Sequence, residues 1–176
     1  MPLVLPSEQT WKSTFLTACL SSFALDFFAR QKVGGVNLNF FIVKQLPILP
    51  PNAFEQPAPW NREVTISEWL KPRILELTYT SVDLIGLAKD FGFDGPPFTW
   101  DEDRRSQIRS ELDACFFHLY GIVRDDVPYI MSTFPIVRRK DEANYGEYRT
   151  ARLILERYDA MAVAFDSGEP YRGPLD

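Results

Sequence analysis

The chain is organised around one stretch, Trp100 to Pro135, which reads W-D-E-D-R-R-S-Q-I-R-S-E-L-D-A-C-F-F-H-L-Y-G-I-V-R-D-D-V-P-Y-I-M-S-T-F-P. Apolar side chains recur in it at helical spacing and form one stripe, namely Ile108, Leu112, Cys115, Phe116 and Leu119. Asp101 or Asp103 can cap this helix, because a carboxylate accepts hydrogen bonds from the free N–H groups of a first turn. The stretch therefore predicts a long amphipathic helix.

The predicted helix ends at Gly121, because glycine adopts the left-handed cap conformation without a steric penalty. Asp125 or Asp126 can then cap a short second helix, with Pro128 tolerated at its start. This pattern indicates packing rather than catalysis.

Helical spacing also predicts segments on both sides of this stretch. The predicted helices are Ser13 to about Lys32, stopped by Gly34 and Gly35; a region from Thr65 or Ser67 to Ala88, with Pro72 in its first turn and a break near Thr80 and Ser81; and Glu147 or Tyr148 to about Phe165. Helices with wide apolar stripes must bury them against one another, which predicts a mainly α fold with a bundle-like C-terminal part.

A small β element is expected at Val36 to Val43, a short run that is rich in β-formers and partly alternating. Asn37 and Asn39 would share one face of this strand. We divide the chain into residues 1–50, a connector at 51–63 and a helical domain at 64–176.

Two stretches are expected to lack regular structure. Residues 46–59 carry five prolines, which disfavour helix and central strand alike and predict an extended connector. Residues 134–146 read as a loop that carries Arg138, Arg139 and Lys140, and this basic run is either a solvated loop, a phosphate contact or part of an ion pair. The tail from Ser167 is expected to run over the surface.

The net charge of −5 argues against a protein that coats nucleic acid by bulk attraction. The charge is uneven: residues 1–50 hold four basic and two acidic side chains, whereas residues 51–103 hold four basic and ten acidic ones. The N-terminal segment is therefore the better candidate to contact phosphate.

No membrane helix and no signal peptide are expected. Cys19 and Cys115 are expected to be buried thiols in a reducing, cytoplasmic compartment.

Catalytic chemistry is hard to nominate. His118 is the single histidine, and we expect no catalytic, cofactor-binding or metal-ligating residue. Cys115 and His118, one turn apart, could form a nucleophile pair, but nothing nearby suggests an oxyanion hole, so we favour a core thiol beside a half-buried imidazole. The chain contains no G-x-x-x-x-G-K-[ST] and no G-x-G-x-x-G motif.

Several strings carry a family resemblance. They are L-S-S-F-A-L-D-F-F-A-R-Q-K-V-G-G (Leu20–Gly35), N-L-N-F-F-I-V-K-Q-L-P-I-L-P-P (Asn37–Pro51), R-S-E-L-D-A-C-F-F-H-L-Y-G (Arg109–Gly121), D-D-V-P-Y-I-M-S-T-F-P-I-V-R-R-K-D-E (Asp125–Glu142) and Y-G-E-Y-R-T-A-R-L-I-L-E-R-Y-D-A-M-A (Tyr145–Ala162). The chain resembles the C-terminal, target-recognition and helical region of type II restriction–modification DNA methyltransferases, phage-defence enzymes that methylate adenine N6.

The resemblance implies a role beside double-stranded DNA. In such enzymes a catalytic domain binds S-adenosylmethionine and flips the adenine out, and a target-recognition domain reads base edges. Residues 1–50 would be the closing helix and strand of that recognition domain. The family's N-P-P-Y or D-P-P-Y motif is missing here, so no catalytic residue is transferred and the cofactor is expected in the parent enzyme, whose catalytic domain is present in cis or in trans.

Eight residues are candidates for DNA contact. Cations would bind phosphates, and asparagine can pair with adenine. The candidates are Arg30, Lys32, Asn37, Asn39, Lys44, Arg138, Arg139 and Lys140. Alternatively Arg30 and Lys32 only complement a helix C-terminus, and the asparagines only satisfy a strand edge.

Two other functions stay open. One is a helical protein–protein interaction module that does not bind DNA, which the expected exposure of Trp60, Trp69 and Trp100 favours. The other is an independent enzyme that uses Cys115 and His118. If residues 1–50 are part of a larger domain, an exposed patch near Leu38–Ile42, or a homodimer that hides it, is expected.

Overall fold

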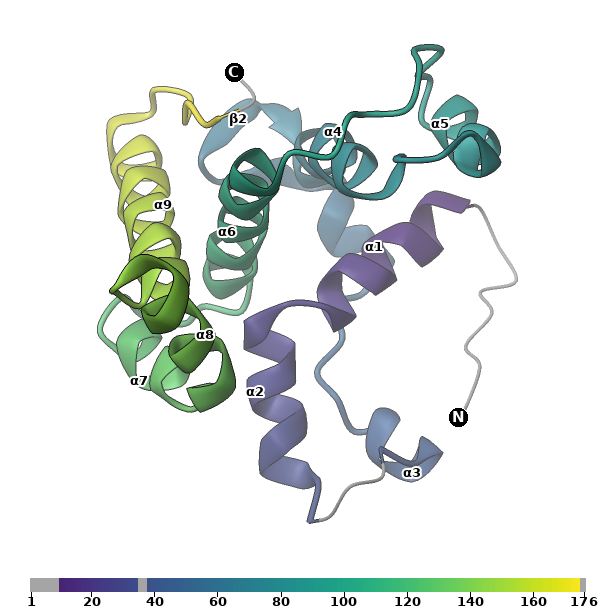
Figure 1. The fold of residues 1–176 in the computed structure, drawn as a ribbon. Coiled ribbons are helices and arrows are strands. Elements are labelled where there is room, and N and C mark those ends of the chain that lie inside the picture. Colours follow the sequence, from purple (N-terminus) through teal and green to yellow (C-terminus); the bar gives the residue numbers. More distant parts are fainter. Residues whose placement is uncertain (1–9, 35–37, 175–176) are drawn as a thin grey trace. The chain divides into compact units, whose positions relative to one another are not determined.

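A computed structural model describes residues 10–34 and 38–174 (Figure 1). These residues form nine α-helices, two short 3₁₀-helices and one two-stranded sheet, which confirms a mainly α fold with a small β element. The chain divides into two compact units. Unit 1 comprises the chain up to Gln56 together with Thr65–Trp100, and unit 2 comprises Pro57–Val64 together with Asp101 onwards. No helix in the described part is both long enough and apolar enough to cross a membrane.

Unit 1 is built from short helices. Its elements are α1 (Thr10–Leu20), α2 (Phe23–Lys32), α3 (Phe40–Val43), the 3₁₀-helix η1 (Pro51–Glu55), α4 (Ile66–Thr78), the 3₁₀-helix η2 (Val82–Leu84) and α5 (Ile85–Asp90).

The single helix predicted from Ser13 to Lys32 is wrong, because the chain breaks between α1 and α2. Ser22 caps α2: its hydroxyl oxygen accepts from the Leu25 N–H at 3.3 Å, and the hydroxyl donates to the Cys19 carbonyl at 2.8 Å. A buried serine that satisfies both helix ends favours two helices over one continuous helix.

The strand predicted at Val36–Val43 is also wrong over its described part. Residues 40–43 form α3, and the Asn39 side chain caps it by accepting from the Ile42 N–H at 3.0 Å. A capping asparagine outweighs the weak β-preference of the residues that follow. Asn37 lies outside the described residues.

The β element lies instead in the region expected to be an extended connector. Pro51 begins η1, where a missing N–H costs nothing, and β1 (Pro57–Ala58) pairs with β2 (Asn61–Thr65). Thr65 and Glu68 then form a capping box that starts α4. Pro72 lies inside α4, beyond its first turn, contrary to the prediction. The expected break near Thr80 is confirmed.

Unit 2 is built on two long helices. Its elements are β1 and most of β2, α6 (Glu102–Leu119), α7 (Asp126–Ser132), α8 (Pro135–Tyr145) and α9 (Arg149–Ser167). Asp101 caps α6 by accepting from the Arg104 N–H at 3.0 Å, and Gly121 follows its end with a φ of 64°, both as predicted. The short helix predicted near Asp125 is α7, although Asp125 makes no side-chain cap bond.

The loop predicted at residues 134–146 is a helix, α8. Pro135 occupies its first turn, and Gly146 ends it with a φ of 74°. The sequence carries this proline-start and glycine-stop pattern, and it outweighs the basic run that lies between the two residues. Asp141 of α8 accepts from the Thr150 N–H at 2.6 Å and so satisfies the start of α9.

The core of unit 2 is the packing of α6 on α9. The fully buried side chains at this contact include Ile108, Cys115, Phe116, Ile154 and Met161. Cys19 and Cys115 are free, buried thiols, as expected.

The tail after α9 is anchored rather than loose. Tyr171 is buried and its N–H donates to the Trp60 carbonyl at 2.8 Å, while Arg104 donates to the Pro174 carbonyl at 3.0 Å. Gly173 passes so close to α6 that an added Cβ would lie 1.8 Å from Oε1 of the fully buried Glu111. We call residues 168–174 the C-terminal strap.

We predict that Gly173→Ala destabilises the protein. The added methyl group must displace a buried carboxylate, and such overpacking typically costs about 1–3 kcal/mol. Urea unfolding followed by circular dichroism measures this loss. Gly86→Ala is the matched control: it lies within α5 with no atom within 4 Å of its Cβ position, so it should be neutral or stabilising. Equal stability of the two variants would contradict the close approach.

Candidate functional site

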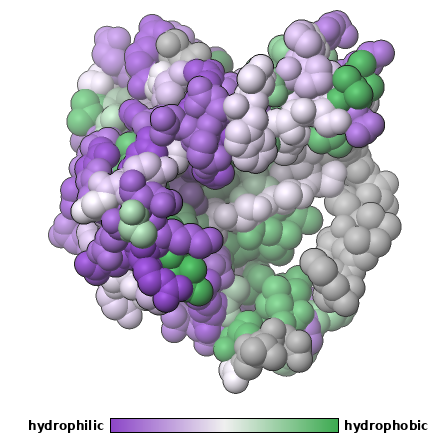
Figure 2. Space-filling model, viewed as in Figure 1, coloured by the Kyte–Doolittle hydropathy of each residue, from purple (hydrophilic) through white to green (hydrophobic). Residues whose placement is uncertain are grey.

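Unit 1 carries a surface in which cations and exposed aromatic rings lie together. We call it the α2–α3 surface and define it as Asp26, Arg30, Lys32, Leu38, Phe40, Phe41 and Lys44. Helices α2 and α3 contact each other, and Figure 2 shows hydrophobic residues gathered over this part of unit 1. Phe40 is 55% exposed and Phe41 is 73% exposed.

The cations of this surface follow from local helix structure. Arg30 and Lys32 lie in the last turn of α2, where positive charge complements the carbonyl end of a helix. Lys44 follows the end of α3, with its Nζ 4.6 Å from the centre of the Phe40 ring. This cation–π contact orients the ammonium group beside the exposed aromatic side chains.

The charge of the α2–α3 surface is positive. Asp26 is the one carboxylate among the described residues from 10 to 50, and it forms an ion pair with Arg30 at 2.9 Å. Both partners are about half exposed, so the pair is weak and Arg30 can exchange it for another anion. Lys32 and Lys44 add charge that no carboxylate of this segment balances.

The sequence candidates do not all fall on this surface. Arg30, Lys32 and Lys44 do. The Asn39 side-chain carbonyl is occupied by the α3 cap, so the two-sided pairing with adenine expected of a strand asparagine is lost. Phe40 and Phe41 were missed as site residues because a strand would have buried one of them.

Arg138, Arg139 and Lys140 belong to α8 in unit 2. Arg138 donates to Glu142 at 2.7 Å, and this hydrogen bond raises the pKa of the guanidinium. Arg139 and Lys140 are exposed. The basic run therefore supplies two cations that are more available than Arg138.

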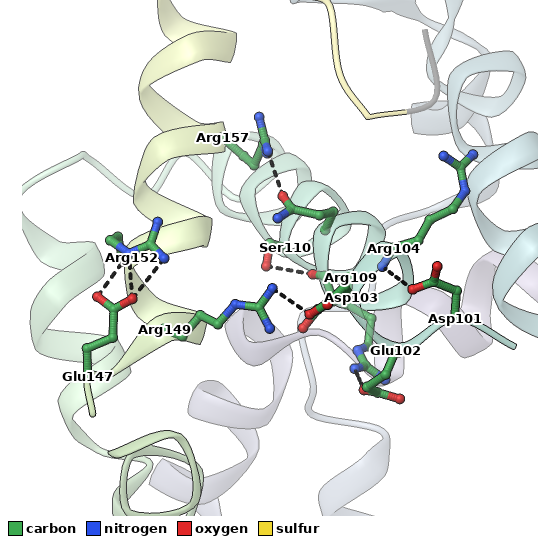
Figure 3. A network of polar contacts seen from close by, with 12 residues as sticks. Asp101, Glu102, Asp103, Arg104, Arg109, Ser110, Glu147, Arg149, Arg152 and Arg157 are labelled. Atoms are coloured by element: carbon green, nitrogen blue, oxygen red, sulfur yellow. Dashed lines mark hydrogen bonds and ion pairs between the residues drawn. The ribbon is translucent and has the colours of Figure 1, made fainter. Parts of the chain in front are cut away.

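Most other arginines of unit 2 are engaged within the unit, as Figure 3 shows. Arg149 points to Asp103 at 2.9 Å, and Arg109 forms an ion pair with Glu102. The remaining pairs are Arg152 with Glu147 at 2.9 Å and Glu156 at 2.7 Å, Arg157 with Gln107 at 2.6 Å, and Arg124 with Asp159 at 3.0 Å. Arg149 and Arg157 join α9 to α6, and Arg124 joins the segment before α7 to α9, whereas Arg109 and Arg152 pair within or beside their own helices. All of them are poor candidates for phosphate contact.

His118 lies in an aromatic cluster of unit 2. Its ring stacks on Tyr158 with 3.8 Å between ring centres, and its Nε2 lies 3.0 Å from the Tyr158 carbonyl oxygen. The Trp60 ring centre is 6.2 Å away. Burial lowers the pKa of His118 and outweighs the opposing effects of the Tyr158 carbonyl and Asp159. A stacked, half-buried imidazole between Tyr158 and Trp60 matches a structural role.

The solvent exposure of the tryptophans differs from the expectation that Trp60, Trp69 and Trp100 are all exposed. Trp60 and Trp69 are buried, whereas Trp100 is 61% exposed. Of these three tryptophans, Trp100 alone can therefore serve as an exposed anchor for a partner. Among the described residues, no three His, Cys, Asp or Glu side chains cluster in a way that could hold a metal ion.

Comparisons with models of protein families, with curated proteins and with solved structures found no match to this chain. The family resemblance therefore depends on the quoted strings alone, and the function it implies is a proposal.

We predict that His118 makes stability pH-dependent. Its folded pKa lies below the ordinary 6.5, so as pH falls below 6.5 the unfolded chain binds the proton first and the free energy of unfolding decreases. Urea unfolding between about pH 7.5 and 5.5, where carboxylates stay ionised, measures this slope. His118→Gln, which keeps a donor toward the Tyr158 carbonyl, should flatten it.

Titration of His118 by NMR is a second and more direct test of its lowered pKa. Because the chain has a single histidine, its imidazole proton signal in NMR is unambiguous. A midpoint at or above 6.5 would contradict the lowered pKa.

Proposed function

We propose that this chain is the DNA-recognition and scaffolding region of a restriction–modification adenine-specific DNA methyltransferase. The observation that carries the proposal is the α2–α3 surface, which combines three cations with one exposed, already paired carboxylate. The quoted strings, which resemble that family, support it. A cytoplasmic location fits this role.

DNA contact in this proposal is made mainly to phosphates. Lys32 and Lys44 are placed to bind backbone oxygens, and Arg30 can leave Asp26 to join them. Such contacts position a protein on the duplex without reading sequence. Because the Asn39 carbonyl caps α3, base readout is assigned to other parts of the parent enzyme.

Scaffolding is assigned to unit 2. Its arginines pair with carboxylates of the same unit, and one of these pairs, Arg149 with Asp103, joins α9 to α6, which favours a rigid helical body over a phosphate-binding one. The sequence lacks the N-P-P-Y and glycine-rich motifs, so the catalytic domain of the parent enzyme would bind S-adenosylmethionine and perform the transfer. That domain is the expected protein partner.

A helical protein–protein interaction module is the second candidate. The exposed Trp100 favours it, since tryptophan is enriched among side chains that anchor interfaces. The acidic balance of residues 51–103 agrees with a partner other than DNA.

Charge reversal tests the DNA proposal. We expect Arg30→Glu with Lys32→Glu to weaken binding to a mixed-sequence duplex by roughly tenfold or more, and to lower the salt slope by about 1 for each lost phosphate contact. Fluorescence anisotropy between about 50 and 200 mM salt measures both quantities.

The matched control is Lys71→Glu with Lys89→Glu, which makes the same change in net charge on α4 and α5 of the same unit. It should retain most of the binding. Equal losses in the two double variants would mean that only net charge matters. Absence of salt-dependent binding in the wild type would favour the interaction module.

A further inference from the structure

Helix α3 presents two neighbouring phenylalanines in an unusual setting. It is only four residues long, begins at the Asn39 cap and is followed by Lys44. None of its residues is buried, and Phe41 is the most exposed of the large hydrophobic residues in the described part of the chain. Single exposed apolar side chains are common, but neighbouring ones such as Leu38, Phe40 and Phe41 form a patch of the kind that marks an interaction site.

The charges around α3 indicate what kind of ligand that is. Lys44 lies over the Phe40 ring, Lys32 ends the helix that contacts α3, and the nearest carboxylate in this segment, Asp26, is paired with Arg30. A ligand that complements this surface must offer both flat apolar faces and negative charge. Nucleic acid with unstacked bases has both properties, since each base has a π-face and each nucleotide a phosphate.

Resting on the proposed DNA-binding function, we infer that α3 is a stacking site for an unpaired or extruded DNA base. The Phe41 ring stacks on the base, and Lys44 and Lys32 bind the adjoining phosphates. A paired duplex hides its base faces, so it meets only the cations of this surface. The protein therefore prefers locally opened DNA to fully paired DNA.

The preference is tested with the full chain and three probes of one sequence: a paired duplex, the same duplex with one unpaired central base, and the single strand. Fluorescence anisotropy should show tighter binding to the two opened probes. Phe41→Ala should weaken binding to them by about tenfold, because base–aromatic stacking contributes that much or more, and should weaken binding to the paired duplex by less, because paired bases offer no face to stack on. Phe41→Trp should retain the preference.

Phe165→Ala is the matched control, because this phenylalanine is also half exposed but belongs to α9 in unit 2. It should not alter the preference. A fluorescent 2-aminopurine at the unpaired position adds a readout of base stacking: its emission should change when the wild type binds and change less when Phe41→Ala binds.

The outcomes separate the two proposals. Salt-dependent duplex binding without any preference for opened DNA, or with a preference that Phe41→Ala does not change, would overturn the stacking site and leave the proposed function standing. No binding to any of the three probes would overturn both, and would indicate that Phe40 and Phe41 instead contact a protein.

Discussion

The packing of α6 against α9 is the contact on which unit 2 depends. Helix α6 has buried side chains around most of its circumference, including the fully buried Glu111, so it is a central rather than a peripheral helix. Its neighbours are fixed by hydrogen bonds at defined points: Asp141 satisfies the start of α9, and the Tyr158 hydroxyl donates to the Ile122 carbonyl after the Gly121 stop. Close packing and satisfied helix ends together favour a single arrangement of the helices in this unit.

The pairing of charges separates structural cations from available ones. Along α6 and α9 the arginines meet carboxylates or a glutamine of the same unit. Two of these contacts, Arg149 with Asp103 and Arg157 with Gln107, hold α9 to α6. The α2–α3 surface has one carboxylate for three cations, and the exposed Phe41 lies on the same surface. By formal charge alone, residues 138–140 would be equally good candidates for phosphate contact. The ion pair of Arg138 with Glu142 leaves fewer cations available there.

Helix spacing predicted the long elements well and the short ones poorly. Both helices predicted in residues 100–135 formed, because a 3.6-residue stripe over many turns favours a helix, but α6 is buried on more than the predicted stripe, since Ser110, Glu111 and Asp113 are also buried. Errors arose where one capping residue decided the outcome: Ser22 divides a helix, Asn39 starts a helix in a run of β-formers, and Pro135 starts a helix in a basic run. The cations of the site were predictable from charge balance. Its aromatic part was not, because exposure depends on tertiary packing that the pattern of α3 does not encode.

The C-terminal strap has a consequence for the order in which the two units fold during synthesis. Unit 2 joins residues 57–64 to residues that follow Asp101, and the Tyr171 N–H reaches the Trp60 carbonyl. During synthesis the 57–64 hairpin leaves the ribosome long before its partners do, whereas every residue of unit 1 has been made by Trp100. Domains form as their segments become available, so unit 1 can fold co-translationally while the hairpin waits for the tail. The last residues of the described chain thus complete a structure begun more than one hundred residues earlier, and the long loop that they close makes unit 2 the slower-folding half.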